Sequence, residues 1–146
     1  MKSEYFIFHK NHKPLDFRKR LIEKIILLSP WVDLCCDAVS DDIDDPILRK
    51  SNYLDVVASL VVANERDKKL LPFSLKYAHF PSTLIQYGTN EILANQATVF
   101  CKLLKSQGVS VKEESFQGLW HVFQSYADLP EAKIAMHNIK TFISDF

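Results

Sequence analysis

The sequence has few glycines, few cysteines and no net charge, and these shortages exclude several classes of protein. Its 146 residues carry eighteen basic and eighteen acidic side chains, so the formal charge is zero. A dedicated nucleic-acid surface is normally strongly basic, and none is expected here. The three cysteines, two of them adjacent at Cys35 and Cys36, show no metal-ligand spacing and are interpreted as reduced thiols. No metal or other cofactor is therefore predicted.

Long hydrophobic runs are absent as well. The longest mainly apolar run, residues 56–63, is too short to cross a bilayer, so no membrane span is predicted in this chain. The amino terminus, Met1-Lys2-Ser3-Glu4, is charged and lacks the pattern of a cleaved signal peptide. The compartment stays open: the cytoplasm is the default, and the endoplasmic reticulum would apply to a longer, anchored form.

Charged residues gather in two clusters of opposite sign. Basic side chains concentrate at residues 9–13 and 18–20, and acidic side chains concentrate at residues 37–45. Both clusters are interpreted as solvated faces of the protein. His9 and His12 lie three residues apart, but their surroundings offer no further ligands for a metal, so they are predicted to be exposed.

Apolar residues, at 47% of the chain, allow one domain with a modest core. Continuous apolar stretches at residues 24–29 and 83–87 predict strands buried on both faces, and residues 109–116 predict a third strand. Amphipathic or capped stretches predict helices over residues 53–64, over residues 91–107 and from Pro130 onward. This alternation predicts an α/β fold with about three parallel strands and flanking helices. One edge of so small a sheet should lack its natural neighbour.

Two residues capable of proton transfer chemistry follow neighbouring strands. Glu91 comes just after Gly88, at the end of the second strand, and His121 follows the third strand in a loop opened by Gly118. A carboxylate that orients a histidine forms two thirds of a nucleophilic hydrolase triad. The alternatives are a packed or exposed histidine, and a glutamate stabilised by the dipole of the following helix.

The third member of such a triad, the nucleophile, is missing from this sequence. Neither a Gly-x-Ser-x-Gly motif nor a His-Gly-Gly-Gly run occurs in it. Ser29 ends the first predicted strand, but Pro30 and Trp31 do not provide the sharp turn with small neighbours that a catalytic serine requires. Without a nucleophile and oxyanion donors no acyl intermediate can form, so the sequence leaves open whether this chain alone is an enzyme.

Several short segments together resemble the carboxyl-terminal half of the hormone-sensitive-lipase-like branch of the α/β-hydrolases. Within that branch they resemble the fungal steryl acetyl hydrolases most. The segments are Leu-Ser-Pro-Trp-Val-Asp-Leu at 28–34, Ser-Asn-Tyr-Leu-Asp at 51–55, Pro-Ser-Thr-Leu-Ile-Gln-Tyr-Gly-Thr-Asn-Glu-Ile-Leu at 81–93, Gly-Val-Ser-Val at 108–111 and Gly-Leu-Trp-His-Val-Phe-Gln at 118–124. The resemblance implies a partial α/β-hydrolase fold. In it, residues 22–146 would be the carboxyl-terminal part of the domain, and residues 1–21 would form a poorly assigned amino-terminal segment.

By this resemblance His121 matches the triad histidine and Glu91 falls where the family places its acid, often an aspartate. The implied function is serine-type hydrolysis of a short-chain or acetyl carboxylic ester, with steryl acetate among the candidates and a place in lipid metabolism. The serine would then come from an upstream segment or a separate chain, and the partner would be a small ester or lipid.

Two alternatives stand beside that function. One is a truncated, non-catalytic remnant that binds a partner or has no function, and the other is an unrelated α/β binding domain. Loss of neighbouring strands would also leave an apolar sheet edge, through which the chain could self-associate.

Overall fold

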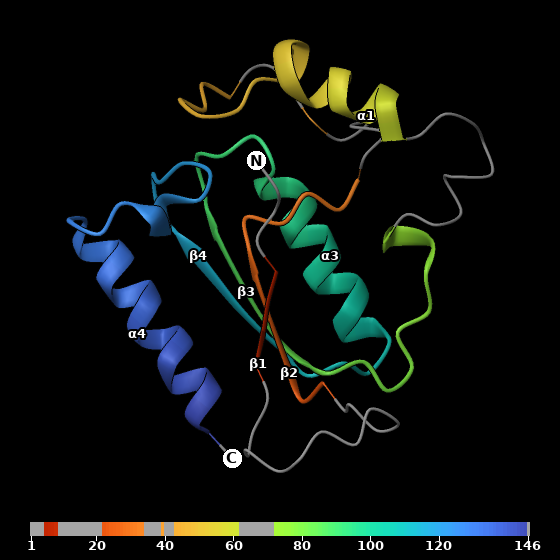
Figure 1. The fold of residues 1–146 in the computed structure, drawn as a ribbon. Coiled ribbons are helices and arrows are strands. Elements are labelled where there is room, and N and C mark those ends of the chain that lie inside the picture. The colour runs from red at the N-terminus through yellow and green to blue at the C-terminus, as the bar shows by residue number, and fades with distance from the viewer. Residues whose placement is uncertain (1–4, 9–21, 34–38, 40–42, 62–71, 146) are drawn as a thin grey trace.

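The computed structural model describes residues 5–8, 22–33, 39, 43–61 and 72–145, which build a sheet covered by helices (Figure 1). The strands are β1 (Tyr5–Phe8), β2 (Lys24–Leu28), β3 (Ser82–Gly88) and β4 (Val111–Phe116). They lie in the order β1-β2-β3-β4. The pairs β2–β3 and β3–β4 are parallel. The predicted α/β fold with three parallel strands is confirmed.

The three predicted helices occur in the predicted order and differ at their ends, and short helical turns accompany them. They are η1 (Lys50–Leu54), a π-helical turn that continues into α1 (Asp55–Val61), the short 3-10 helices η2 (Pro72–Ser74) and η3 (Phe123–Ser125), and the long helices α3 (Ala94–Ser106) and α4 (Pro130–Ser144). The helix predicted over residues 53–64 begins earlier, at Lys50, and its predicted last residues lie outside the described ones. The helix predicted from Glu91 begins three residues later, because residues 89–93 form turns.

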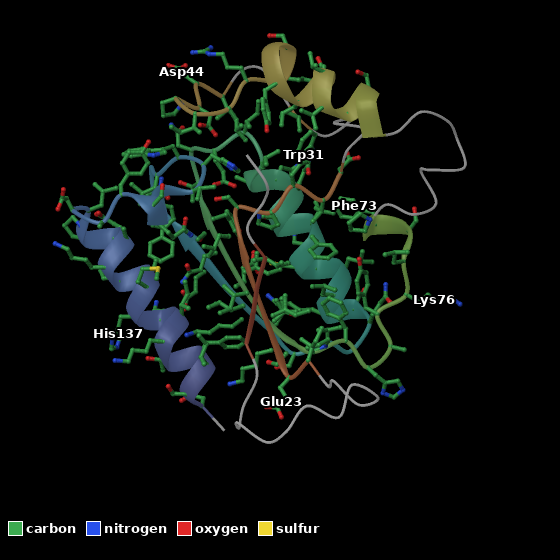
Figure 2. The ribbon with its side chains drawn as sticks, in the orientation of Figure 1. Glu23, Trp31, Asp44, Phe73, Lys76 and His137 are labelled. Atoms are coloured by element: carbon green, nitrogen blue, oxygen red, sulfur yellow. The ribbon has the colours of Figure 1, made fainter. Side chains whose placement is uncertain are left out.

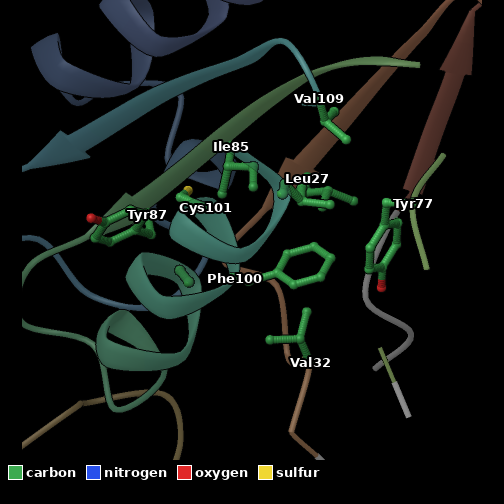
Figure 3. Packing of buried hydrophobic residues seen from close by; sticks show 10 residues of the cluster. Leu27, Val32, Tyr77, Ile85, Tyr87, Phe100, Cys101 and Val109 are labelled. Carbon is green, nitrogen blue, oxygen red and sulfur yellow. The ribbon is translucent and has the colours of Figure 1, made fainter. Parts of the chain in front are cut away.

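The two long helices pack on opposite faces of the sheet, because successive strand side chains point to opposite sides. Leu27 and Ile85 contact α3, where Phe100 lies at the centre of their cluster (Figure 3). Ile26 and Leu84 point the other way and form a second cluster with Ile139 and Phe142 of α4. Full burial of one such aliphatic side chain stabilises the fold by about 2 kcal/mol.

A buried polar network joins α4 and η3 to the sheet. Gln86, on β3, donates from its amide nitrogen to the Ala135 carbonyl (2.9 Å) and to Glu114 Oε2 (2.8 Å). Gln124, in η3, donates in turn to Gln86 Oε1 at 3.4 Å. Since Gln124 lies three residues after His121, this network also fixes the place where the histidine segment rejoins the sheet.

The first strand, β1, lies at one edge of the sheet. β1 pairs antiparallel with β2, from Tyr5 opposite Leu27 to Phe8 opposite Lys24. The amino-terminal segment therefore supplies backbone donors and acceptors to β2. The expectation that one edge of the sheet lacks its natural neighbour stays a prediction. The outermost strands of the described sheet are β1 and β4. Self-association through a sheet edge stays a prediction.

Several sequence predictions fall on residues that the structure does not describe. These are the basic clusters at 9–13 and 18–20, including His9 and His12, together with Cys35 and Cys36. The third cysteine, Cys101, is free and buried in the α3 cluster, as the interpretation of reduced thiols requires for it. Within the described ranges, no helix combines the length and the apolar character needed to span a bilayer.

Candidate active site

The parallel strands end at one edge of the sheet, and the candidate residues follow those ends. Glu23 precedes β2 and Trp31 follows it, and Figure 2 shows Glu23 at the bottom of the view and Trp31 in the upper half, beneath α1. The carboxyl ends of the parallel strands therefore face α1 (Figure 1). Polar groups that follow such strand ends are where α/β proteins usually bind their ligands.

Glu91 lies in the turn after β3 and is fully buried. Its Oε2 atom accepts a hydrogen bond from Ser29 Oγ at 2.6 Å and another from the Gly88 amide at 3.1 Å. Its Oε1 atom is also buried, yet it has no hydrogen-bond partner in the described part of the chain. The carboxyl group is thus held through Oε2, and Oε1 is left to accept a further hydrogen bond.

His121 lies in the turn after β4, and the same turn is tied to the Glu91 turn through the backbone. The Asn90 amide donates to the Leu119 carbonyl at 2.9 Å, and the Gly118 amide donates to Thr89 Oγ1 at 2.8 Å. The imidazole itself is different, because its buried Nδ1 atom has no partner among the residues described. No hydrogen bond therefore joins Glu91 to His121 in this structure, although both side chains present a buried, unpaired atom.

The close approach of these two turns requires a glycine at position 88. A Cβ atom there would lie 2.1 Å from the carbonyl oxygen and 2.4 Å from the carbonyl carbon of Leu119. Both are backbone atoms, so no side-chain rotation could relieve the clash. From its position in the sequence Gly88 was expected only to end a strand, whereas in the structure it is the contact point between the glutamate and histidine turns.

Ser29 also belongs to this site, in a role that the sequence did not predict. It directly follows β2, is 1% exposed, and accepts a hydrogen bond from the Val122 amide at 3.0 Å while it donates to Glu91. No hydrogen bond to His121 accompanies these contacts, so the geometry is not that of a nucleophile activated by the histidine. The feature of the sequence that could have identified Ser29 was its position after a buried strand. That strand ends at the same sheet edge as the strands that precede Glu91 and His121.

Asp45 corrects the interpretation of residues 37–45 as a solvated acidic face. It is 1% exposed, and its carboxylate accepts hydrogen bonds from three backbone amides: Ile47 (2.8 Å) and Leu48 (3.2 Å) in its own turn, and Ile92 (3.1 Å) in the glutamate turn. Three such donors compensate the burial of a charge. The neighbouring Asp44 is exposed, as predicted. Asp45 therefore anchors the segment before η1 to the turn that carries Glu91.

Burial moves the two titratable groups of the site toward their neutral forms. It raises the pKa of Glu91 to about 7, against the hydrogen bonds from Ser29 and Gly88, and the negative charge of Asp45 raises that pKa further. Burial lowers the pKa of His121 to about 4, with Asp45 acting in the opposite direction. His121 is consequently neutral at neutral pH, the form in which an imidazole can accept a proton.

The acidic, histidine and cysteine side chains of the described residues do not cluster. Nowhere in residues 5–8, 22–33, 39, 43–61 and 72–145 do three His, Cys, Asp or Glu side chains gather at distances suited to one ion. The candidate site consists of the Glu91 carboxyl group, the His121 imidazole and the Ser29 hydroxyl. The Asp45 carboxylate is bonded to the turn that carries Glu91.

The fold and the arrangement of these turns agree with a family match along most of the chain. A family described as alpha/beta hydrolase fold matches residues 7–125. The chain belongs to this family. The family match begins within β1, includes the turn of His121 and ends at the last residue of η3.

The chain is similar to proteins named as esterases and lipases. It is 28% identical over 131 residues to an esterase of Acinetobacter venetianus, a match that covers 81% of this chain and 41% of that esterase. A hormone-sensitive lipase from a metagenome library superposes with a TM-score of 0.76 at 28% identity, over 83% of this chain and 43% of that one. An esterase from the bacterial hormone-sensitive lipase family gives a TM-score of 0.70 at 28% identity, over 80% and 41%.

These matches confirm the resemblance to the hormone-sensitive-lipase-like branch. The chain spans about two fifths of the length of the relatives it matches, a share that agrees with the expected half of a hydrolase domain. The narrower resemblance to fungal steryl acetyl hydrolases stays a prediction, and so does the division of the chain at residue 22.

Proposed function

We propose that this chain supplies the acid and the general base of a serine-type carboxylic-ester hydrolase. The observation that carries the proposal is the pairing of two buried turns at one sheet edge. One presents Glu91 Oε1 and the other presents His121 Nδ1, and both atoms lack partners among the described residues. A buried polar atom without a partner is costly, which favours a site that forms a further bond when the reaction requires it.

The two side chains would divide the proton chemistry between them. The neutral imidazole of His121 would take the proton of a serine hydroxyl as that oxygen attacks the ester carbonyl, and would return it to the leaving alcohol. Glu91 would accept a bond from Nδ1 and stabilise the imidazolium that forms meanwhile. The sequence holds no Gly-x-Ser-x-Gly motif, so the serine would come from a segment outside these 146 residues.

The substrate class is proposed from the relatives and from the apolar residues above the site. Three of the similar proteins are named as an esterase, a hormone-sensitive lipase and an esterase of that lipase family. Trp31 and Tyr53 are half-buried and pack on the cluster that contains Ile92 and Leu93, next to Glu91. We infer a short-chain or acetyl ester as substrate, with an apolar part that could contact these rings; steryl acetate is one candidate.

The test isolates whatever native species contains this chain, through a tag placed after Phe146 in the source organism. We expect that species to hydrolyse 4-nitrophenyl acetate and to be labelled by a fluorophosphonate, whereas the purified 146-residue chain should do neither. His121→Ala should lower hydrolysis by about 10³-fold or more, because the general base is lost. His137→Ala, on the exposed side of α4, is the matched control and should have no effect.

Two results would contradict the proposal. Ester hydrolysis that survives His121→Ala would remove the histidine from the reaction. A tagged species that neither hydrolyses the ester nor reacts with the fluorophosphonate would favour the alternative, a non-catalytic remnant that acts by binding or has no function.

A further inference from the structure

The hydroxyl group of Ser29 makes two hydrogen bonds whose directions can be assigned. Its oxygen lies 2.6 Å from Glu91 Oε2 and 3.0 Å from the Val122 amide nitrogen. A backbone amide can only donate, so the hydroxyl accepts from Val122. A serine hydroxyl has one hydrogen, and here it is left to point at Glu91. One buried atom therefore contacts the glutamate and the residue that follows His121.

This contact determines which oxygen of Glu91 remains available. Oε2 receives Ser29 and the Gly88 amide, whereas Oε1 receives no donor in the described residues. The Gly88 amide is fixed by the backbone. Asp45, the other charged group that acts on Glu91, is an acceptor whose negative charge repels the carboxylate. Among the described side chains, the hydrogen-bond donor to Glu91 is therefore Ser29.

The backbone at Ser29 gives a second, independent reason to assign a role to the hydroxyl. Its φ angle is +46°, in the left-handed region that residues other than glycine seldom adopt. The conformation is supported by a hydrogen bond from the Ser29 amide to the Gln86 carbonyl, at 2.8 Å. Glycine would adopt this conformation more easily, so the backbone geometry alone does not account for a serine here.

We propose that Ser29 is a positioning residue, whose hydroxyl holds the Glu91 carboxyl and the His121 turn in one register and thereby directs Glu91 Oε1 toward the imidazole. The effect of this contact on catalysis rests on the proposed function. The hydrogen bond itself does not, so the two can be tested separately.

The first experiment follows the titration of the Glu91 carboxyl carbon by NMR in the 146-residue chain, with Glu91→Gln to assign the signal. Both Ser29→Ala and Ser29→Gly remove the hydroxyl, but only glycine relieves the left-handed backbone. We expect the pKa of Glu91 to rise by about one pH unit or more in both variants, because a hydrogen bond to the charged form is lost. Ser106→Ala, which removes an exposed hydroxyl at the end of α3, should leave the titration unchanged.

The pair of variants also distinguishes the hydroxyl from the backbone. If Ser29→Gly kept the wild-type titration while Ser29→Ala changed it, the backbone conformation would be the cause and the proposal would be overturned. An unchanged titration in both variants would overturn it too. Should the alanine variant fail to fold, the glycine variant, which fits the φ angle better, decides the question alone.

The second experiment measures turnover in the tagged native species. We expect Ser29→Ala and Ser29→Gly to lower kcat by about tenfold with KM within about twofold, since the hydroxyl acts through Glu91 and not on the substrate. Changed titration without any ester hydrolysis would refute the proposed function and leave the Ser29 contact established. Unchanged titration with hydrolysis that depends on His121 would refute the role of Ser29 and leave the proposed function intact.

Discussion

The turn that carries Glu91 and the turn that carries His121 lie side by side, yet they hold their side chains in different ways. The glutamate receives hydrogen bonds from Ser29 and from Gly88, and its turn is bound by Asp45. The His121 turn is held by its backbone, and the imidazole Nδ1 has no partner among the described residues. Hydrogen bonds within this chain thus hold the Glu91 carboxyl group itself. In the His121 turn, the same kind of bond holds the backbone but does not reach Nδ1 of the imidazole.

The two side chains also respond to burial in opposite directions. Loss of water disfavours the charged form of each, which raises the pKa of an acid and lowers that of a base. Glu91 and His121 show these two shifts within one site. The site therefore holds two groups whose neutral forms are favoured by burial.

The largest expected effect comes from separating the two turns. Gly88→Ala places a Cβ atom against the backbone of Leu119, and we expect it to lower the free energy of unfolding by about 4 kcal/mol, since backbone must move. Urea denaturation measures it. Gly108→Ala is the control: Gly108 has φ +81° and no atom within 4 Å of the added Cβ, so only about 1 kcal/mol should be lost. Equal losses would mean that the contact between the turns is unimportant.

The next effect concerns the anchoring of the glutamate turn alone. Asp45→Ala removes the acceptor of three backbone amides, two of them in its own turn and one at Ile92. We expect a loss of about 3 kcal/mol in the free energy of unfolding, at roughly 1 kcal/mol for each bond. The exposed neighbour provides the comparison, because Asp44→Ala removes only an exposed ion pair to Arg49, worth about 0.5 kcal/mol or less. Similar losses from both variants would contradict the anchoring role.

The opposite pKa shifts predict opposite pH dependences of stability. The folded-state pKa of Glu91, about 7, exceeds its ordinary 4.5, so its stabilising contribution is complete below 4.5 and is lost as the pH rises through 7. The folded-state pKa of His121, about 4, lies below its ordinary 6.5, so its contribution is complete above 6.5 and is lost as the pH falls through 4. Between 4.5 and 6.5 the two slopes oppose each other in the unmodified chain.

Single variants should separate these slopes. In Glu91→Gln only the histidine remains, and the free energy of unfolding should rise with pH by about 1.4 kcal/mol per unit between 4.5 and 6.5. In His121→Gln it should fall by a similar amount. Urea denaturation at half-unit steps across this window gives both slopes. Parallel curves for the two variants would show that burial does not dominate both groups.

Much of the framework was predictable because it depends on local patterns. The buried strands at residues 24–28 and 82–88 and the helix that begins at Pro130 follow from apolar runs and from the fixed φ angle of proline. The placement of Glu91 and His121 after neighbouring strands was read in the same way. By contrast, β1 was missed, since a four-residue strand acquires its identity from pairing with β2 and not from its own sequence.

The sequence by itself determined the α/β order of elements and which strand ends carry the glutamate and the histidine, because periodicity and strand direction are encoded in neighbouring residues. Only the tertiary structure decided the connections within the site. Ser29 and Glu91 are 62 residues apart, and Ser29 and Val122 are 93 apart. From the sequence, Asp45 was interpreted as one of several surface acids. In the structure its carboxylate accepts a hydrogen bond from the Ile92 amide. Such contacts form when distant segments share a buried volume, where each polar group must find a partner that local sequence does not specify.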